Sequence, residues 1–376
     1  METKRRKLFS VAFTLTGTVI GAGILGLPYV FAQSGFLIGL FWLVFLGIVM
    51  TFLNLWIGEI TLRTKKTHQL PGYAEKYLGK KMGKVLFVTL IFGIYSALIA
   101  YLIGEGQSLS RLFFGNVKYS LLFGIGFWAI MTFVLQGGIR RLKSLEFWSV
   151  VAILLSLTFS FLFLLPDVRL DNISYVNPPS FFLPFGVMLF SLLGFNSVPE
   201  LRREVGRDKR MLKGAIIIGS LIPVIVYLMF SLVFVGVLGK SVGEVATLSF
   251  SGLFGKLLIL FGIFTMMSSF FVLSFALRDS FIFDLKKKSW SFFFVSFVPL
   301  VLYLFVSIFE LANFVRVLGI GGAVSGGLTG IIILLMNKAS KEKGDIKPEY
   351  SISLNGLIVG ILSLIFLAGI FFEVFR

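Results

Sequence analysis

The chain has 376 residues, of which 57% are hydrophobic and only 14% charged, and 45 are Phe. Soluble globular proteins have about 45–50% apolar and about 25% charged residues, so this composition is typical of an integral membrane protein. The absence of Cys and the single His, His68, exclude disulfide scaffolds, thiol nucleophiles, iron–sulfur clusters and bis-His haem ligation. We therefore expect no cofactor.

Apolar runs long enough to cross a membrane, about 20 residues each, recur eleven times along the chain. They cover roughly residues 9–33, 36–61, 85–110, 118–137, 145–165, 181–199, 212–238, 253–277, 290–309, 313–336 and 352–374. Runs such as Phe292, Phe293 and Phe294 lack the alternation of transmembrane strands. We predict an all-α membrane protein with eleven transmembrane helices in a single domain, residues 1–376.

Lys and Arg residues are distributed unequally between the two sides that these spans define. Of the 35 cations, 28 lie in the N-terminal tail and in the loops on its side, and 7 lie on the opposite side. The positive-inside rule then predicts a cytoplasmic N-terminus and an external C-terminus, in the cell (inner) membrane. The net charge of +17 thus reflects topology and contact with lipid head groups. No nucleic acid partner is expected.

The first span contains Gly17, Gly21, Gly23, Gly26 and Pro28, which together disfavour a continuous helix. Close helix packing is one explanation, because Gly17 and Gly21 form a small-xxx-small motif. An interrupted helix is the other. Freed backbone N–H groups in such a break suit a carboxylate, and freed C=O groups suit a cation.

The sixth span has a similar weak point between Ser191 and Ser197, within the string from Phe190 to Pro199, and Pro199 is expected to disfavour αR geometry at Val198. At about 1.5 Å per residue, both weak points lie near the middle of a hydrocarbon core about 30 Å thick. Two interrupted helices five spans apart are expected from an inverted repeat of five helices. We place repeat one at about residues 8–165, repeat two at about 180–337, and an extra helix at about 352–374.

The eighth span carries the hydroxyl side chains of Thr265, Ser268 and Ser269. Ser268 lies at about the depth of the break in the first span, at about 1.5 Å of rise per residue. Hydroxyls that face backbone carbonyls would form an all-oxygen site for a small, hard cation. The alternative is that these side chains donate to carbonyls of their own helix.

At these positions the sequence resembles the amino acid–polyamine–organocation superfamily of permeases, whose members have the LeuT-type fold. The string GTVIGAGILGLPYVFAQSGF in the first span is most similar to the amino acid/auxin permeases and to the hydroxy and aromatic amino acid permeases. SSFFVLSFALRDSFIFDL and GFNSVPELRREVG resemble the eighth and sixth helices of the latter group. The resemblance covers ten spans and implies a LeuT-type 5+5 inverted repeat with discontinuous helices 1 and 6, plus one extra C-terminal helix.

The resemblance also implies a substrate site. The amides of Ala22 and Gly23 would receive the carboxylate of an amino acid. Carbonyls near Thr18, Val19, Phe190 and Leu193 would hold its ammonium group, with Phe190 as an aromatic gate and Tyr101 as a wall or hydroxyl donor. Room left by Gly21, Gly23 and Gly194 beside Phe190 would favour an apolar or aromatic side chain.

A sodium site shared by sodium-coupled members matches the backbone of Gly17 and Ile20 together with the hydroxyls of Ser268 and Ser269. Glu105, in the outer part of the third span, has two interpretations. It is either a carboxylate in an outer vestibule or a protonatable coupling or gate residue, because an ionisable group at this depth costs at least about 2 kcal/mol without water or a partner. Glu59 is expected to form an ion pair at the cytoplasmic end.

The sequence thus predicts a secondary active symporter that imports neutral amino acids by alternating access around helices 1 and 6, with Na⁺ as the coupling ion. Proton coupling and a non-transporting amino acid sensor are the alternatives. An intramembrane enzyme is not expected, because the spans contain no Cys, no His and no facing pair of acidic residues.

Overall fold

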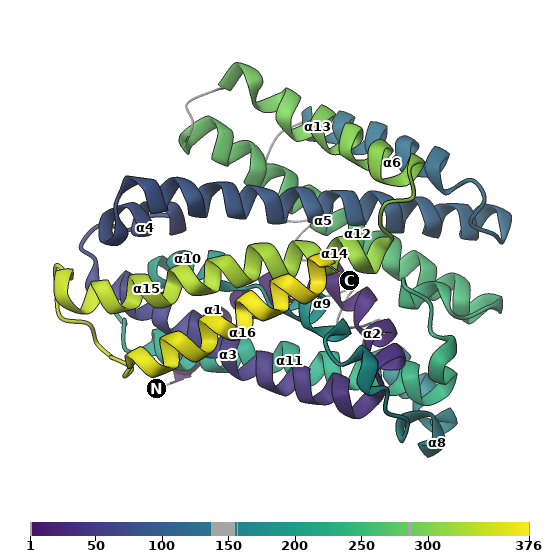
Figure 1. The fold of residues 1–376 in the computed structure, drawn as a ribbon, viewed down its shortest axis with the longest axis horizontal. Coiled ribbons are helices and arrows are strands. Elements are labelled where there is room, and N and C mark those ends of the chain that lie inside the picture. Colours follow the sequence, from purple (N-terminus) through teal and green to yellow (C-terminus); the bar gives the residue numbers. More distant parts are fainter. Residues whose placement is uncertain (1, 137–154, 156, 285–287, 376) are drawn as a thin grey trace.

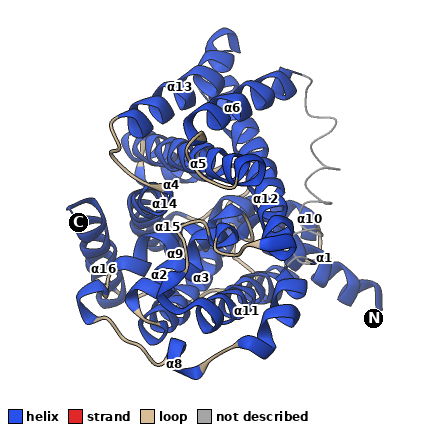
Figure 2. Cartoon of the chain, turned by 90° about the vertical axis from the view of Figure 1, so that its right-hand side faces the viewer, coloured by secondary structure: helices blue, strands red, loops and turns tan. Residues whose placement is uncertain are grey.

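The computed structural model describes residues 2–136, 155, 157–284 and 288–375, and the regular secondary structure of this part is helical. The long helices run side by side along the longest axis of the molecule (Figure 1) and form a bundle when viewed from one end (Figure 2). Their bounds are α1 (Glu2–Val19), α2 (Leu27–Ser34), α3 (Phe36–Arg63), α4 (Leu70–Leu78), α5 (Lys80–Phe114), α6 (Ser120–Gln136), α8 (Leu170–Ile173), α9 (Leu183–Ser191), α10 (Val198–Val205), α11 (Met211–Leu238), α12 (Gly252–Asp279), α13 (Lys288–Ile308), α14 (Phe314–Gly321), α15 (Gly327–Lys343) and α16 (Gly356–Phe375).

Seven helical spans in the described residues are long and apolar enough to cross a membrane, and the bent pair formed by α1 and α2 adds an eighth. The prediction of an all-α multi-pass membrane protein is confirmed. The span predicted at 118–137 is the shorter helix α6, with 17 residues. The span predicted at 181–199 is divided into α9 and α10. The one predicted at 145–165 lies largely outside the described residues, so the total of eleven stays a prediction.

The first break is narrower than the glycine pattern suggested. Helix α1 continues through Gly17 and ends at Val19, and a short 3-10 turn, η1 (Ala22–Gly26), leads into α2. The two parts are bent by 50°. Gly21 adopts an extended conformation at the bend. Pro28 lies in the first turn of α2, where its missing N–H costs no intrahelical hydrogen bond.

The second break separates α9 from α10 and contains the short 3-10 turn η5 (Phe195–Ser197). Val198, which we expected to avoid the αR region, is in fact αR, with φ −57° and ψ −39°. The correction has a simple cause, since Pro199 occupies the first turn of α10 and begins a helix there. The chain therefore unwinds before Val198.

The two ends of the bundle differ. The N-terminus, α4 and the end of α15 lie at one end, on the left of Figure 1, which we call the N-terminal end. Helix α8 and the turn between α5 and α6 lie at the other, which we call the α8 end. The N-terminal tail and the segment between α3 and α5, both rich in cations, are therefore on the same side, as the predicted topology requires.

A buried carboxylate ties the segment before α16 to the N-terminal end of the bundle. The fully buried Glu59 pairs with Arg63, with an N···O distance of 2.8 Å. It also accepts hydrogen bonds from the Ser351 hydroxyl at 2.7 Å, the Ile352 amide at 3.0 Å and the Asn337 amide at 3.3 Å. Glu59 thus joins α3, α15 and the chain that leads into α16, and the expected ion pair is confirmed.

A seam of glycines lets α9 approach α14 at backbone distance. Helices α14 and α15 form one span through the π-helical segment η9 (Gly322–Gly326). A Cβ on Gly186 of α9 would overlap the carbonyl oxygen of Gly319, and a Cβ on Gly322 would overlap the carbonyl oxygen of Gly186. We call Gly186, Gly319 and Gly322 the glycine seam. It holds the half-helix α9 in place beside the break.

Replacing Gly186 by Ala is therefore expected to destabilise the protein by about 1–3 kcal/mol, the usual cost of overpacking. Thermal unfolding of the purified protein in detergent measures the loss. Gly126→Ala in α6 is the matched control, because no atom lies within 4 Å of the added Cβ. That control should keep or raise the stability, by up to about 1 kcal/mol. Equal unfolding temperatures for Gly186→Ala and the unaltered protein would show that α9 does not need to approach α14 this closely.

Candidate functional site

The two breaks lie directly against each other. A Cβ on Gly23 would lie 2.7 Å from Ser191 Oγ and 3.1 Å from the Phe190 ring. A Cβ on Gly194 would lie 2.7 Å from Val19 Cγ2. The glycines at 23 and 194 thus permit contact between the breaks, and the space expected there for a substrate side chain is filled by protein in this conformation. The substrate site itself stays a prediction.

Tyr227 of α11 joins the two breaks. Its buried hydroxyl lies 2.7 Å from the Val19 carbonyl oxygen and 2.9 Å from the Ser191 carbonyl oxygen. Each carbonyl belongs to the last residue of a half-helix, and the Val19 carbonyl also accepts from the Gly21 N–H at 3.0 Å. The hydroxyl therefore satisfies backbone groups on both sides, as an apolar interior requires.

Sequence reasoning missed Tyr227, although a signal was present. It is the one tyrosine of the largely apolar helix α11, and a buried tyrosine hydroxyl normally has a hydrogen-bond partner. Sequence reasoning also missed Asn54, a buried polar residue of the largely apolar helix α3. Its Nδ2 lies 3.3 Å from the Ser220 hydroxyl of α11 and 3.5 Å from the position of a Cβ on Gly194.

Ser269 of α12 reaches the amide expected to bind the substrate carboxylate. The Ala22 N–H donates to Ser269 Oγ at 3.2 Å, and the same oxygen would lie 3.3 Å from a Cβ on Gly21. The Tyr101 hydroxyl of α5 contacts the Ser269 side chain. The structure thus brings Ala22, Ser269 and Tyr101 together in one chain of polar groups.

The remaining residues of the predicted sodium site are arranged differently. Ser268 donates to the Thr265 carbonyl of its own helix at 3.0 Å, which is the alternative considered from the sequence. Gly17 lies within α1. The Ile20 amide donates to the Thr16 carbonyl at 2.8 Å, so Ile20 still takes part in the last turn of α1. Ser268 and Ser269 are both partly accessible.

Exposure around the breaks is asymmetric. Thr18, on the N-terminal side of the first break, is exposed and donates to the Thr14 carbonyl at 3.0 Å. Asn196, on the corresponding side of the second break, is exposed, and Leu193 is partly accessible. Tyr101, toward the α8 end, is buried. Polar side chains on the N-terminal side of the breaks are therefore exposed, whereas Tyr101 on the other side is buried.

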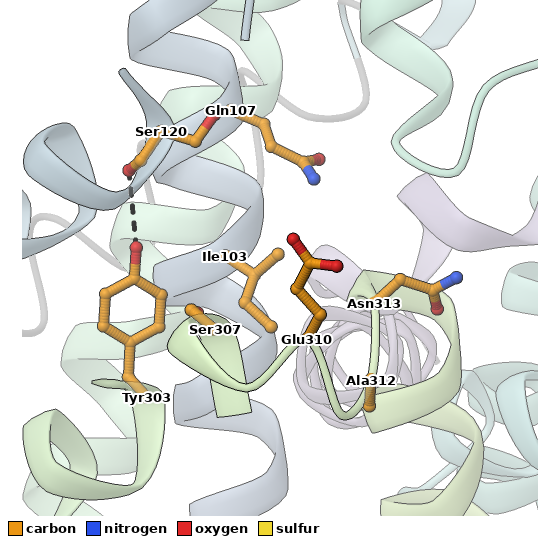
Figure 3. A pocket seen from close by; sticks show the side chains of 8 residues that line it. All are labelled: Ile103, Gln107, Ser120, Tyr303, Ser307, Glu310, Ala312 and Asn313. Carbon is orange, nitrogen blue, oxygen red and sulfur yellow. Dashed lines mark hydrogen bonds between the residues drawn. The ribbon is translucent and has the colours of Figure 1, made fainter. Parts of the chain in front are cut away.

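A cavity of about 280 Å³ lies apart from these residues, near the α8 end (Figure 3). The side chains of Gln107 and Glu310 face each other across it in Figure 3. The Tyr303 hydroxyl, which also lines it, donates to the Ser120 carbonyl at 3.3 Å. None of the residues expected in the substrate or sodium site lines this cavity.

Comparison with known proteins decides the family. The profile of the tryptophan/tyrosine permease family matches residues 4–376. The chain belongs to this family. The predicted resemblance to aromatic amino acid permeases is thus confirmed at the level of the family, whereas membership of the larger superfamily and the LeuT-type arrangement stay predictions.

Curated relatives of this permease are amino acid transporters by name. Glutamine transporter 2 of Aliivibrio fischeri is 28% identical over 239 residues, covering 61% of each chain. Tyrosine-specific transport system 1 of Haemophilus influenzae is 27% identical over 234 residues, covering 60% of this chain and 57% of the relative. The tryptophan-specific transport protein of Shigella flexneri is 26% identical over 290 residues, covering 70% and 69%. The chain matches about three fifths of the length of the glutamine transporter and of the tyrosine-specific system.

The family and the apolar helices together make this a multi-pass membrane protein of an amino acid transporter family. This agrees with the expectation of a transporter in place of an enzyme.

The bridge made by Tyr227 yields a prediction. Tyr227→Phe removes the hydroxyl that joins the buried Val19 and Ser191 carbonyls, and leaves the Val19 carbonyl with the Gly21 N–H at 3.0 Å. We expect a loss of about 1–3 kcal/mol in stability and a tenfold or greater loss of amino acid affinity, about 1.4 kcal/mol. Thermal unfolding and binding calorimetry measure the two effects.

Tyr95→Phe is the matched control, because Tyr95 of α5 donates to the Phe294 carbonyl at 3.0 Å, away from the breaks. It should lose stability and keep its affinity. A Tyr227→Phe protein that binds amino acid as tightly as the control would show that the bridge has no part in binding.

Proposed function

We propose that this permease imports neutral, apolar or aromatic L-amino acids across the cell membrane by alternating access around its two broken helices. The observation that carries the proposal is the contact between the breaks, joined by Tyr227 and lined by Ala22 and Ser269. Backbone groups of unwound helices at membrane depth are tolerated where they meet a ligand or a cavity, and such breaks form the substrate sites of many secondary transporters.

The substrate carboxylate is proposed to bind the amides of Ala22 and Gly23. In the described conformation Ser269 Oγ accepts the Ala22 N–H, so a carboxylate would replace a hydroxyl at this amide. The stronger, charge-assisted hydrogen bond favours the exchange. The ammonium group is proposed to bind carbonyls near Thr18, Val19, Phe190 and Leu193.

The substrate class is supported by the polarity of the site and by the relatives. The residues that surround the breaks are uncharged on α1, α9, α11 and α12, so no side chain there would pair with a charged substrate side chain. The three relatives compared above are named for glutamine, tyrosine and tryptophan, which are all neutral, whereas a further relative, lysine histidine transporter-like 3 of Arabidopsis thaliana, is not named for a neutral amino acid alone. A neutral amino acid is therefore proposed for this chain, with an apolar or aromatic one preferred.

Sodium is the proposed coupling ion, bound by the backbone of Gly17 and Ile20 and the hydroxyls of Ser268 and Ser269. Support comes from the position of Ser269 at the first break, 3.2 Å from the Ala22 nitrogen. Binding of Na⁺ would require Ser268 to turn from the Thr265 carbonyl toward α1. Proton coupling is the second candidate, favoured by the buried carboxyl group of Glu105.

Uptake of labelled tryptophan or tyrosine into proteoliposomes tests the function. We expect accumulation when Na⁺ is higher outside, and none when a pH gradient is the only driving force. Accumulation driven by the pH gradient without Na⁺ would replace sodium by the proton. Binding of amino acids in a thermal-shift experiment, without flux in either case, would identify a sensor.

The sodium site has its own test. Ser268→Ala and Ser269→Ala are each expected to raise the Na⁺ concentration for half-maximal uptake about tenfold, equivalent to about 1.4 kcal/mol. Ser274→Ala is the matched control, since Ser274 is a buried serine of the same helix, more than one turn after Ser269. An unchanged Na⁺ dependence in both site variants would contradict the assignment.

A further inference from the structure

Glu105 of α5 is a fully buried carboxyl group without a hydrogen-bond partner. Its residue exposure is 0%, and within the described part of the chain neither carboxyl oxygen has a partner. Gly104 packs against Met266 and Phe314, and Gly106 packs against the Ser120 carbonyl at the start of α6. Neighbours on both sides thus enclose Glu105.

The surroundings of Glu105 favour a neutral acid over an ion. The carboxyl lies against the backbone of Met267 on α12, and the neighbouring side chains on α12 and α14 include Met266 and Phe314. An ionised carboxylate in an apolar interior without a partner is strongly disfavoured relative to its protonated form.

Charged and titratable groups are present on the packed elements but do not pair with Glu105. Helix α6 carries none in its described residues. Those toward the α8 end of the other neighbours lie on four helices and in the adjoining loops: Tyr101 and Arg111 of α5, Lys256 of α12, Tyr303 of α13, Arg316 of α14, and Lys118, Tyr119, Glu244 and Glu310 of the loops. Burial raises the pKa of Glu244, whose carboxylate accepts from Asn313 at 2.6 Å.

Glu105 lies on the same face of α5 as the candidate site. Tyr101, Glu105 and Ser108 are spaced i, i+4 and i+7, which places them on one face of a helix, and all three are buried. Tyr101 contacts Ser269, which accepts from the Ala22 amide. Glu105 is therefore about 6 Å along the helix from Tyr101, one turn toward the α8 end. Gln107, which lines the cavity of Figure 3, lies about 200° around the axis of α5 from Glu105, on nearly the opposite face of the helix.

We propose that Glu105 is a proton-binding site that links the affinity for the amino acid to pH on the α8 side of the membrane. In the described conformation, in which Glu105 is fully buried, the carboxyl group holds the proton. When α5, α12 and α14 separate and water enters from that end, the O–H bond breaks and the proton passes to water, leaving the carboxylate hydrated. Substrate binding that closes this end takes the proton up again.

A proton fits this position better than a metal cation. A hard cation such as Na⁺ requires several oxygen ligands. Besides Glu105, the buried face of α5 offers Ser108 Oγ, while the adjoining α12 and α14 offer thioether and aromatic groups. The proposal rests on the proposed function, since it concerns the affinity for an amino acid, and it holds whichever ion drives the flux.

Binding calorimetry with tryptophan or tyrosine on the full-length protein in detergent tests the inference. Repeating each titration in buffers of different ionisation enthalpy counts the protons exchanged on binding. The unaltered protein should take up about one proton, so that affinity falls as pH rises, by at most about tenfold per pH unit. Glu105→Gln should bind with no proton uptake and with an affinity independent of pH.

Glu310→Gln is the matched control, because Glu310 is an exposed carboxylate near the same end, and it should behave as the unaltered protein. Equal proton uptake in Glu105→Gln and the control would overturn the inference. If Glu105→Gln does not fold, infrared difference spectra of the unaltered protein and Glu105→Asp replace it. A substrate-induced carboxylic acid band that shifts in Glu105→Asp supports the inference, and its absence overturns it.

The two proposals fail in different ways. Binding of amino acid by the unaltered protein without proton uptake overturns the role of Glu105 and leaves the proposed function intact. No binding of any neutral amino acid overturns the proposed function together with this inference.

Discussion

The structure depends on one constraint, the need to satisfy backbone polar groups where two helices unwind inside an apolar bundle. An unpaired carbonyl or amide in such an environment costs as much as a lost hydrogen bond or more. Tyr227 meets this need for Val19 and Ser191, and Ser269 meets it for Ala22. Because each of these side chains comes from a different helix, the position of the breaks fixes how α11 and α12 pack around them. The packing of the bundle and the composition of the candidate site therefore have the same cause.

Several parts of this arrangement follow from the sequence alone. Long apolar runs give the helices, and the density of glycine and proline between Gly17 and Pro28 gives the first break. The start of the helix after each break is also predictable, since Pro favours the first turn of a helix and Pro28 and Pro199 occupy the first turns of α2 and α10. The same rule explains the error at Val198, where Pro199 starts α10 and does not end a helix.

Other parts depend on contacts between residues far apart in the chain. Nothing near Gly194 in the sequence shows that the Val19 side chain packs against it. Likewise, nothing near Ala22 shows that its N–H donates to Ser269. The role of Tyr227 requires knowing that its hydroxyl lies between two half-helix ends. Local patterns report helix propensity and burial, whereas the partners of a polar group are set by tertiary packing. The residues predicted for the two sites therefore lie on helices that meet at the breaks, while the hydrogen-bond partners of Ala22 and Ser268 were set by packing.

The glycine seam has a consequence for how a transporter of this kind can move. Where side chains interlock, two helices slide only by crossing a barrier at each knob. Gly186, Gly319 and Gly322 place bare backbone against bare backbone, so the surface between α9 and α14 is smooth. Small sliding of packed helices is a known form of domain movement. At the seam, a small displacement of α9 along α14 would therefore move backbone past backbone, and no side-chain rotamer at Gly186, Gly319 or Gly322 would have to change.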